Sequence, residues 1–342
     1  MGGMEDMTTL VALASRHSLV MGADSLGTAT RRLVNPARLS RFFDPDDDFK
    51  LRVGDDGKPI LADVFQLAEE AEHVPYNQLL HVRKLFKLGT LPVGVAFTGI
   101  TAIGANTIRG LIVEFTEKDP AIKAGGRTNY TVYRIAQRLL RLLRQYYEQE
   151  FPQEFLRQDL ELLVGGYDRA KQYPVIIRVD VRNDKLERVF SPGAFGIAFS
   201  GQMDWIQRIV FGTDVRNQVK LHTRVEYLLR LYQQKIIEGL QSDGHQLDVP
   251  EPDAFGEELQ LFHEWSLDGL RANWAEFSEQ NAIDCVDFFL GIMIRAQDVS
   301  EQLPTVGGDV HIAVIRKDGF HPVTKEVWKH RDYEVPIPEV GR

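Results

Sequence analysis

The sequence of 342 residues contains a single cysteine and no long apolar run. Because Cys285 has no second cysteine to pair with, the chain forms neither an internal disulfide nor a metal site of several thiolates. Its apolar neighbours in AIDCVDFFLGI predict a thiol packed in the core. No apolar run approaches the roughly 18 to 20 residues of a membrane span, and the stretch MGGMEDM lacks the zones of a signal peptide. These absences predict a cytoplasmic protein without a membrane partner.

Basic runs and ligand-spaced histidines are also missing. The net charge of −9 is spread along the chain, which argues against a nucleic-acid partner. The nine histidines show no His-Glu-x-x-His or similar spacing, so we expect no metal site. The glycine pairs in VGGYDRA and PTVGGD lack the Gly-Lys-Ser/Thr ending of a phosphate loop, and no cofactor is expected. With 44% hydrophobic residues, the chain has enough apolar side chains for a normal globular core.

Short, apolar and partly alternating segments predict two blocks of four strands, each followed by helical periodicity, and two strands at the end. Thr101 is a candidate helix cap. The predicted strands are 8–14, 17–24, 84–89, 93–99, 160–168, 173–181, 185–191, 195–201, 309–319 and the segment after Gly319, and the predicted helices are 101–118, 131–151, 203–212, 215–240, 254–278 and 280–298.

This order has no strand–helix–strand alternation, which favours an α+β fold rather than a doubly wound one. We expect two stacked antiparallel sheets with helices on their outer faces, a four-layer αββα sandwich that forms one domain over 1–342. The first four strands are expected to form one antiparallel unit. The segment 29–81, with a hairpin candidate at Asp56-Gly57, is predicted to be an insertion, and 213–277 an expanded helical region.

The stretch MTTLVALASRHSLVMGADS carries the chemistry of greatest interest. A threonine hydroxyl is a poor nucleophile unless a base takes its proton, and a free α-amino group on the same residue can serve, because its pKa is about 8. Thr8 acquires such an amine only if residues 1–7 are removed.

Five segments, in the same order, resemble the proteasome β-subunit family of N-terminal-nucleophile hydrolases. They are TTLVALASRHSLVMGADS, VRKLFKLGTLPVGVAFTG, ELLVGGYD, AFGIAFSGQ and TVGGDVHIAVIRKDG. The resemblance covers the expected sandwich core and leaves out 29–81 and 213–277.

The resemblance implies a role for each matched residue. Thr8 falls on the catalytic threonine, Lys84 on the catalytic lysine, and Asp24 on the aspartate that holds the lysine. Gly99 falls on the glycine whose amide completes the oxyanion hole, and Ser200 on the serine that supports the threonine amine.

Two departures from the family pattern concern the end of the chain and its start. The segment IRAQDVSEQLPTVGG has extra residues, so Asp298 is the candidate for the family's aspartate, and Ser300 and Thr305 compete for its second serine. Met7 stands where a self-processing precursor has glycine. If translation starts at Met7, an aminopeptidase can expose Thr8; if it starts at Met1, self-cleavage at Met7-Thr8 is needed.

Each residue also has a purely structural interpretation. Thr8 and Thr9 are typical of an ordinary strand, and Asp24 is typical of a turn. Lys84 is typical of the charged residues that prevent a sheet edge from pairing with another chain. Gly99 suits a turn with positive φ, and Ser200 a helix cap.

The sequence therefore predicts a threonine peptidase or amidase that acts on a peptide or amide substrate. The resemblance further implies a homo-oligomer, and the identity of an unfoldase partner stays open. A small-molecule amidase of the same fold, in which 29–81 narrows the cleft, is one alternative. A catalytically silent structural subunit, in which Thr8 stays blocked, is the other.

Overall fold

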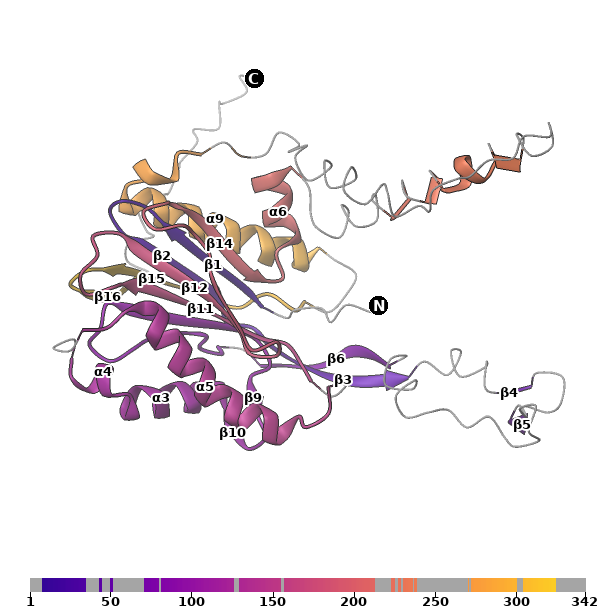
Figure 1. Ribbon diagram of the computed structural model, residues 1–342, viewed down its shortest axis with the longest axis horizontal. Helices are drawn as coiled ribbons and strands as arrows, with labels where there is room; N and C mark the ends of the chain where they lie inside the picture. The colour runs from indigo at the N-terminus through magenta and orange to yellow at the C-terminus, as the bar shows by residue number, and fades with distance from the viewer. Residues whose placement is uncertain are drawn as a thin grey trace, which may run out of the picture. The chain divides into compact units, whose positions relative to one another are not determined.

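The computed structural model describes residues 8–34, 43–44, 50–51, 71–79, 81–125, 129–154, 157–212, 270, 272–299 and 304–323, with short stretches between 223 and 238 (Figure 1). The chain divides into two compact units. One comprises Met1–Gln202 and Trp274–Arg342, and the other comprises Met203–Asn273. The second unit contains helix α6, Asp204–Phe211, which ends at Gly212 in the left-handed conformation with φ 77°.

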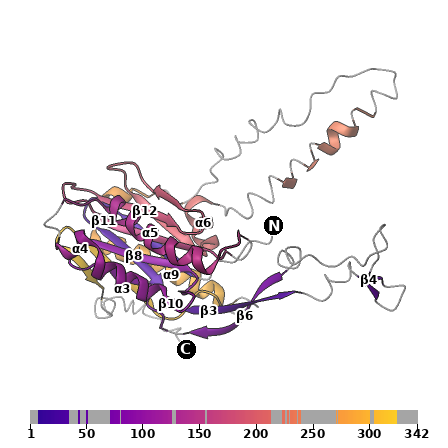
Figure 2. The same cartoon turned by 60° about the horizontal axis from the view of Figure 1, so that its bottom comes forward.

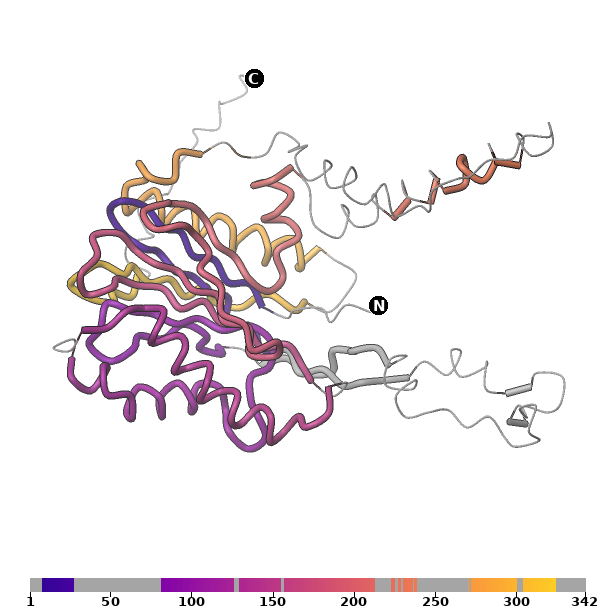
Figure 3. The backbone as a smooth tube through the Cα atoms, in the orientation of Figure 1, coloured from indigo at the N-terminus to yellow at the C-terminus, as the bar shows by residue number. Residues whose placement is uncertain are grey.

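The first unit contains two five-stranded antiparallel sheets. In the first sheet the strand order is β14-β1-β2-β15-β16. Its strands are β14 (Gly196–Gly201), β1 (Thr9–Ala14), β2 (Leu19–Asp24), β15 (Val310–Arg316) and β16 (Gly319–Pro322). Figure 3 shows β1, in indigo, running beside β14, which lies almost two hundred residues later in the chain.

The second sheet has the order β13-β12-β11-β8-β7. Its strands are β13 (Lys185–Arg188), β12 (Pro174–Asp180), β11 (Leu160–Tyr167), β8 (Val93–Gly99) and β7 (Leu85–Lys87). Alternate residues of both sheets meet in a core that includes Leu10, Met21, Leu163 and Ile315, all buried. Each such side chain contributes about 1.5–3 kcal/mol by leaving water, so the two sheets form a stacked pair.

Helices cover the outer face of each sheet (Figure 2). Helices α3 (Ile108–Lys118) and α5 (Val132–Glu150), joined by α4 (Pro120–Lys123), bury their apolar faces against β8, β11 and β12. Helix α9 (Glu279–Asp298) packs on β1, β2 and β15. The approach is close at Gly22, where a Cβ atom would lie 2.5 Å from the Val286 side chain. The prediction of an α+β fold with antiparallel sheets is confirmed.

The expected grouping of the strands is wrong in one respect. The first four predicted strands do not form one unit, because β1 and β2 belong to one sheet and β7 and β8 to the other. The second block is divided in the same way, since β14 leaves β11–β13 to pair with β1.

The predicted cap of the first helix is also corrected. Thr101 does not begin a helix, because β9 (Ala102–Ile103) and β10 (Asn106–Thr107) form a small hairpin there. Helix α3 starts at Ile108, and its N-cap is Thr107, whose side chain accepts from the Gly110 N–H at 3.0 Å.

At the two ends of the predicted insertion 29–81, strands β3 (Gly27–Val34) and β6 (Ala71–Leu79) pair along their whole length, with a register shift at Ala29/Thr30. β3 begins two residues before the predicted start of the insertion. A second short pair joins β4 (Phe43–Asp44) and β5 (Lys50–Leu51). The hairpin predicted at Asp56-Gly57 and most of the predicted 213–277 expansion lie outside the described residues.

The composition led to expectations about Cys285 and about membrane-spanning helices. Cys285, on α9, is partly buried, and burial raises the pKa of its thiol to about 12. Among the helices that the structure describes, none has the length and apolar character needed to cross a lipid bilayer.

Candidate active site

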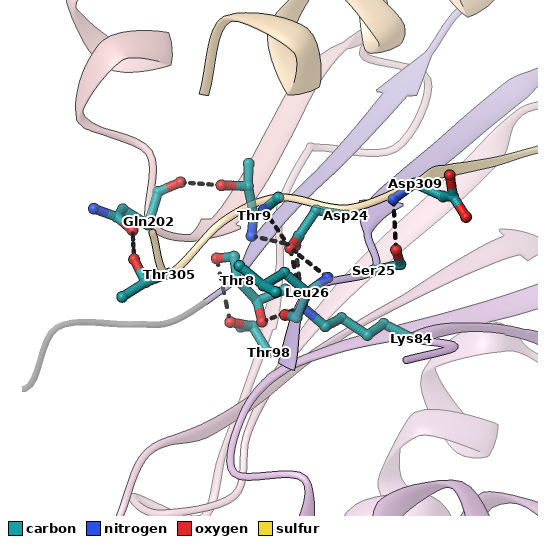
Figure 4. A network of polar contacts seen from close by, with 11 residues as sticks. Thr8, Thr9, Asp24, Ser25, Leu26, Lys84, Thr98, Gln202, Thr305 and Asp309 are labelled. Atoms are coloured by element: carbon teal, nitrogen blue, oxygen red, sulfur yellow. Dashed lines mark hydrogen bonds and ion pairs between the residues drawn. The ribbon is translucent and has the colours of Figure 1, made fainter. Parts of the chain in front are cut away.

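Thr8 directly precedes β1 and is 3% exposed (Figure 4). The backbone N–H of Gln202 donates to the carbonyl oxygen of Thr8 at 2.7 Å. The Thr98 hydroxyl lies 3.5 Å from the same oxygen. Thr8 is therefore held between Gln202, which follows β14 of one sheet, and Thr98, the penultimate residue of β8 in the other.

Lys84 immediately precedes β7, and its side chain is 1% exposed. Its Nζ donates to Thr8 Oγ1 at 2.7 Å and to the Leu26 carbonyl at 2.5 Å. The same nitrogen lies 3.1 and 3.2 Å from the two carboxylate oxygens of Asp24. A lysine ammonium has three N–H donors, and these three acceptor groups account for all of them. The ammonium is thus fixed beside the Thr8 hydroxyl.

Asp24 ends β2 and is completely buried. Its Oδ1 accepts from the Thr9 N–H at 3.0 Å, and its Oδ2 accepts from the N–H groups of Leu26 and Gly307, both at 3.2 Å. Three backbone amides and one ammonium therefore surround a single carboxylate, which satisfies its acceptor capacity without water.

Burial dominates the electrostatics of this pair. Removal from water lowers the pKa of Lys84, and the opposing attraction of Asp24 offsets only part of that effect. The same burial raises the pKa of Asp24, against the influence of Lys84 and of the Thr9 and Gly307 amides. Each group is thus shifted toward its neutral form, which makes proton movement at this site less costly than between ordinary side chains.

Two glycines shape the backbone around Thr8. Gly201 has φ 82°, and a Cβ there would lie 1.9 Å from the Thr8 carbonyl oxygen. Gly99, which follows Thr98, has φ 96°, and a Cβ would lie 2.1 Å from the Asp159 carbonyl oxygen. Neither position has space for a side chain, and both backbone conformations favour glycine. Gly99 is thus next in sequence to a residue that touches Thr8, while its role as an oxyanion donor stays a prediction.

Ser200 lies in β14, opposite Leu10 of β1, so it is not a helix cap. Its hydroxyl donates to Glu161 Oε2 at 2.5 Å. Side chains alternate between the two faces of a strand, which directs Ser200 toward the neighbouring sheet. Gln202, two residues later, makes the main-chain contacts with Thr8 and Thr9. Gln202 is not among the predicted site residues, although it is part of the quoted Ser-Gly-Gln sequence.

Of the candidates near the chain's end, Thr305 lies in the network. Its hydroxyl donates to Gln202 Oε1 at 2.5 Å (Figure 4). Its backbone N–H donates to Gln297 Oε1 at 3.1 Å. Asp298 is exposed at the end of α9, and Gln297 beside it reaches Thr305 instead. Ser300 lies outside the described residues.

The structure therefore brings together Thr8, Asp24 and Lys84, and Thr305 is linked to Thr8 through Gln202. Gly99 and Ser200 are adjacent in sequence to Thr98 and Gly201, which lie against Thr8. Thr98, the Leu26 carbonyl and the Gly307 amide join them without having been predicted. In the part of the chain that the structure describes, no three His, Cys, Asp or Glu side chains are arranged to hold a metal ion. What the site offers is a hydroxyl beside a buried ammonium, an arrangement suited to nucleophilic chemistry.

Comparisons with known proteins add no identification. Neither a scan against protein-family models nor a search of curated proteins gives a match to this chain.

Proposed function

We propose that this chain is a threonine hydrolase of the N-terminal-nucleophile type, similar to proteasome β-subunits, which cleaves peptide-type bonds with Thr8 Oγ. The observation that carries the proposal is the 2.7 Å contact between Lys84 Nζ and Thr8 Oγ1, inside a fully paired and buried Lys84–Asp24 unit. A lysine that only guarded a sheet edge would extend into solvent rather than lie 1% exposed against a hydroxyl.

In the proposed mechanism, removal of residues 1–7 gives Thr8 a free α-amine that takes the proton of its own hydroxyl. The nearby Lys84 ammonium favours the developing negative charge on Oγ. Asp24 keeps the ammonium in place through the bonds described above.

The attacking Oγ forms a bond to the substrate carbonyl carbon, and the oxygen of that carbonyl becomes negative. The Gly99 N–H is the proposed donor to this oxygen, a contribution of about 3 kcal/mol for one such donor. The Thr8 ammonium then returns the proton to the leaving amine as the C–N bond breaks. Water attacks the resulting ester, which releases the acid and restores the Thr8 hydroxyl.

The proposal includes the finer description of the fold and the assembly. We infer that the first unit is an αββα sandwich of the N-terminal-nucleophile class, and that the chain assembles as a homo-oligomer and works in the cytoplasm without a cofactor. The helix, sheet, sheet and helix layers of the first unit support this fold. The same proposal includes an unfoldase that acts with this protein, and the identity of that unfoldase stays open.

A catalytically silent structural subunit is the second candidate, because Met7 precedes Thr8 where a self-processing chain has glycine. In that case the Lys84–Asp24 pair serves only the fold. A small-molecule amidase differs from a peptidase only in the substrate that the same site accepts.

The test is a Thr8→Ala variant, compared with the parent for hydrolysis of fluorogenic peptides and small amides. Because the nucleophilic oxygen is missing, we expect the rate to fall by about 10³-fold or more. Thr116→Ala is the matched control, since its hydroxyl only donates to the Ile112 carbonyl within α3. The intact mass of the parent should show that residues 1–7 have been removed. After treatment with a β-lactone, the parent should gain the mass of one acyl group, and the Thr8→Ala variant should gain none.

Full activity of the Thr8→Ala protein would contradict the hydrolase proposal. A parent chain that retains residues 1–7, hydrolyses nothing and takes no acyl group would favour the silent subunit.

A further inference from the structure

The main chain of Gln202 supports two consecutive residues of the nucleophile segment. Its N–H donates to the Thr8 carbonyl at 2.7 Å, and its own carbonyl accepts from Thr9 Oγ1 at 2.6 Å. Gly201 makes this approach possible, because any side chain there would collide with the Thr8 carbonyl. The position of Thr8 thus depends on the position of Gln202.

The side chain of Gln202 is in turn held from the far end of the chain. Thr305 Oγ1 donates to Gln202 Oε1 at 2.5 Å, and Gln297 Oε1 accepts from the Thr305 N–H. Gln297 belongs to α9, which is packed on β1, β2 and β15 by buried residues such as Val286 and Leu290. The contacts therefore connect Thr8 to a fixed helix through Gln202, Thr305 and Gln297, which we call the neutral relay.

We propose that the neutral relay positions Thr8 for attack, with Gln202 as a positioning residue. This inference rests on the proposed function. The three side chains are uncharged, so the relay fixes geometry without adding a charge near the Thr8 amine. A misplacement of about 1 Å at a reacting group can cost about 10²-fold in rate, which makes such a support necessary.

The charge balance around Thr8 then comes from groups on other elements. The ionisable groups near Thr8 or the Lys84–Asp24 pair include Asp24 at the end of β2, Lys84 before β7, Glu161 in β11 and His311 in β15. Two more charged residues, Arg83 and Asp309, act on His311. A charge introduced at Gln202 would add to this set and should alter the titration of the Thr8 amine.

Two substitutions of Gln202 separate positioning from simple structural support. Gln202→Ala removes the acceptor for Thr305, and we expect kcat to fall by about 10- to 100-fold with KM changed less than about twofold. Gln202→Glu keeps an acceptor for the Thr305 hydroxyl and adds a negative charge. It should retain most of the rate at pH 9, while the acid limb of the pH profile moves upward by about 1 pH unit, because the charge favours the protonated amine.

The readouts are peptide hydrolysis and the rate of β-lactone acylation, measured from pH 5 to 10 together with the melting temperature. Gln280→Ala is the control, because Gln280 lies on α9 like Gln297 but its side chain donates to the half-buried Asp284 instead of joining the relay. Thr305→Val provides a second break in the relay and should lower kcat as Gln202→Ala does.

Unchanged kcat in both Gln202→Ala and Thr305→Val, with Thr8→Ala inactive, would overturn the relay and leave the hydrolase proposal intact. Equal losses in the Ala and Glu variants, with a lowered melting temperature and an unmoved acid limb, would also overturn it. An active Thr8→Ala protein would instead remove the proposed function on which the relay depends.

Discussion

Two cation–carboxylate pairs in the same unit behave in opposite ways. In the Lys84–Asp24 pair the side chains are 1% and 0% exposed, and burial lowers the pKa of Lys84 and raises that of Asp24. In the Arg316–Glu279 pair they are 45% and 30% exposed, and mutual hydrogen bonding raises the pKa of Arg316 and lowers that of Glu279. The exposed pair favours the charged forms, while the buried pair works against them.

The difference indicates what each pair is for. The exposed pair joins α9 to β15 and makes a small contribution to stability. The buried pair bears a desolvation cost that its mutual attraction repays only with extra hydrogen bonds, here from the Thr9, Leu26 and Gly307 amides. A pair that is costly to build and lies against a hydroxyl is typical of a reactive site.

Removing the buried cation should have the largest effect. Lys84→Ala leaves Asp24 uncompensated, so we expect the free energy of unfolding to fall by about 3–5 kcal/mol. Hydrolysis should fall by about 10³-fold at the same time, because the charge beside Thr8 Oγ is lost. Urea denaturation and peptide hydrolysis measure the two effects. The exposed Lys87 in β7 provides the control, Lys87→Ala, which should leave both near the parent values. A Lys84→Ala protein as stable as the parent would show that the pair carries no buried charge.

An intermediate effect is expected on the pH dependence. In the proposed mechanism the charged form of Lys84 assists Thr8, and burial lowers the pKa of Lys84 from the ordinary 10.5. The alkaline fall in kcat/KM should therefore occur below pH 10.5. In Lys84→Arg, the guanidinium stays charged throughout this range. That variant should be slower but lack the alkaline fall, as measured from pH 7 to 11. If the parent and Lys84→Arg show the same alkaline fall in kcat/KM, that fall comes from the titration of a group other than Lys84.

The exposed pair should give the smallest effect. Glu279→Gln removes the ion pair and should lower the free energy of unfolding by about 0.5 kcal/mol at pH 7. The folded-state pKa of Glu279 is lowered, so its stabilisation is present above the ordinary value of 4.5 and is lost as the pH falls through the lower folded value. The parent and the variant should therefore converge in acid denaturation curves. Glu117→Gln, at an exposed position on α3, serves as the reference. A difference that grows on acidification would contradict this assignment.

Local sequence patterns predict the elements of this fold better than their partners. Periodicity places α5 and α9 within a residue or two, because their apolar faces repeat over many turns. Periodicity cannot predict that β1 pairs with β14, because the local sequence of a strand does not identify a partner strand that lies far away in the chain. The blocks of strands therefore suggest sheets that the chain does not form.

The site follows the same division. The positions of Thr8, Asp24 and Lys84 follow from a resemblance spread over several strands, and their side chains meet as expected. Ser200 and Gln202 are harder to separate, because residues two apart along a strand share the same face. The Leu26 carbonyl and the Gly307 amide are backbone groups, which any residue type supplies, so the sequence gives no sign of them.

The pairing of β3 with β6 has a consequence for how the molecule can be altered. β3 starts three residues after Asp24 and β6 ends five residues before Lys84, and the two strands are paired from their first partner, Gly27 with Leu79. Because the pairing of Gly27 with Leu79 already closes the loop that joins Asp24 to Lys84, the length of the segment between β3 and β6 does not change the distance between these two side chains. The segment between the strands is thus a natural place to graft a reporter domain, or to shorten the protein, while keeping the ammonium and carboxylate in register.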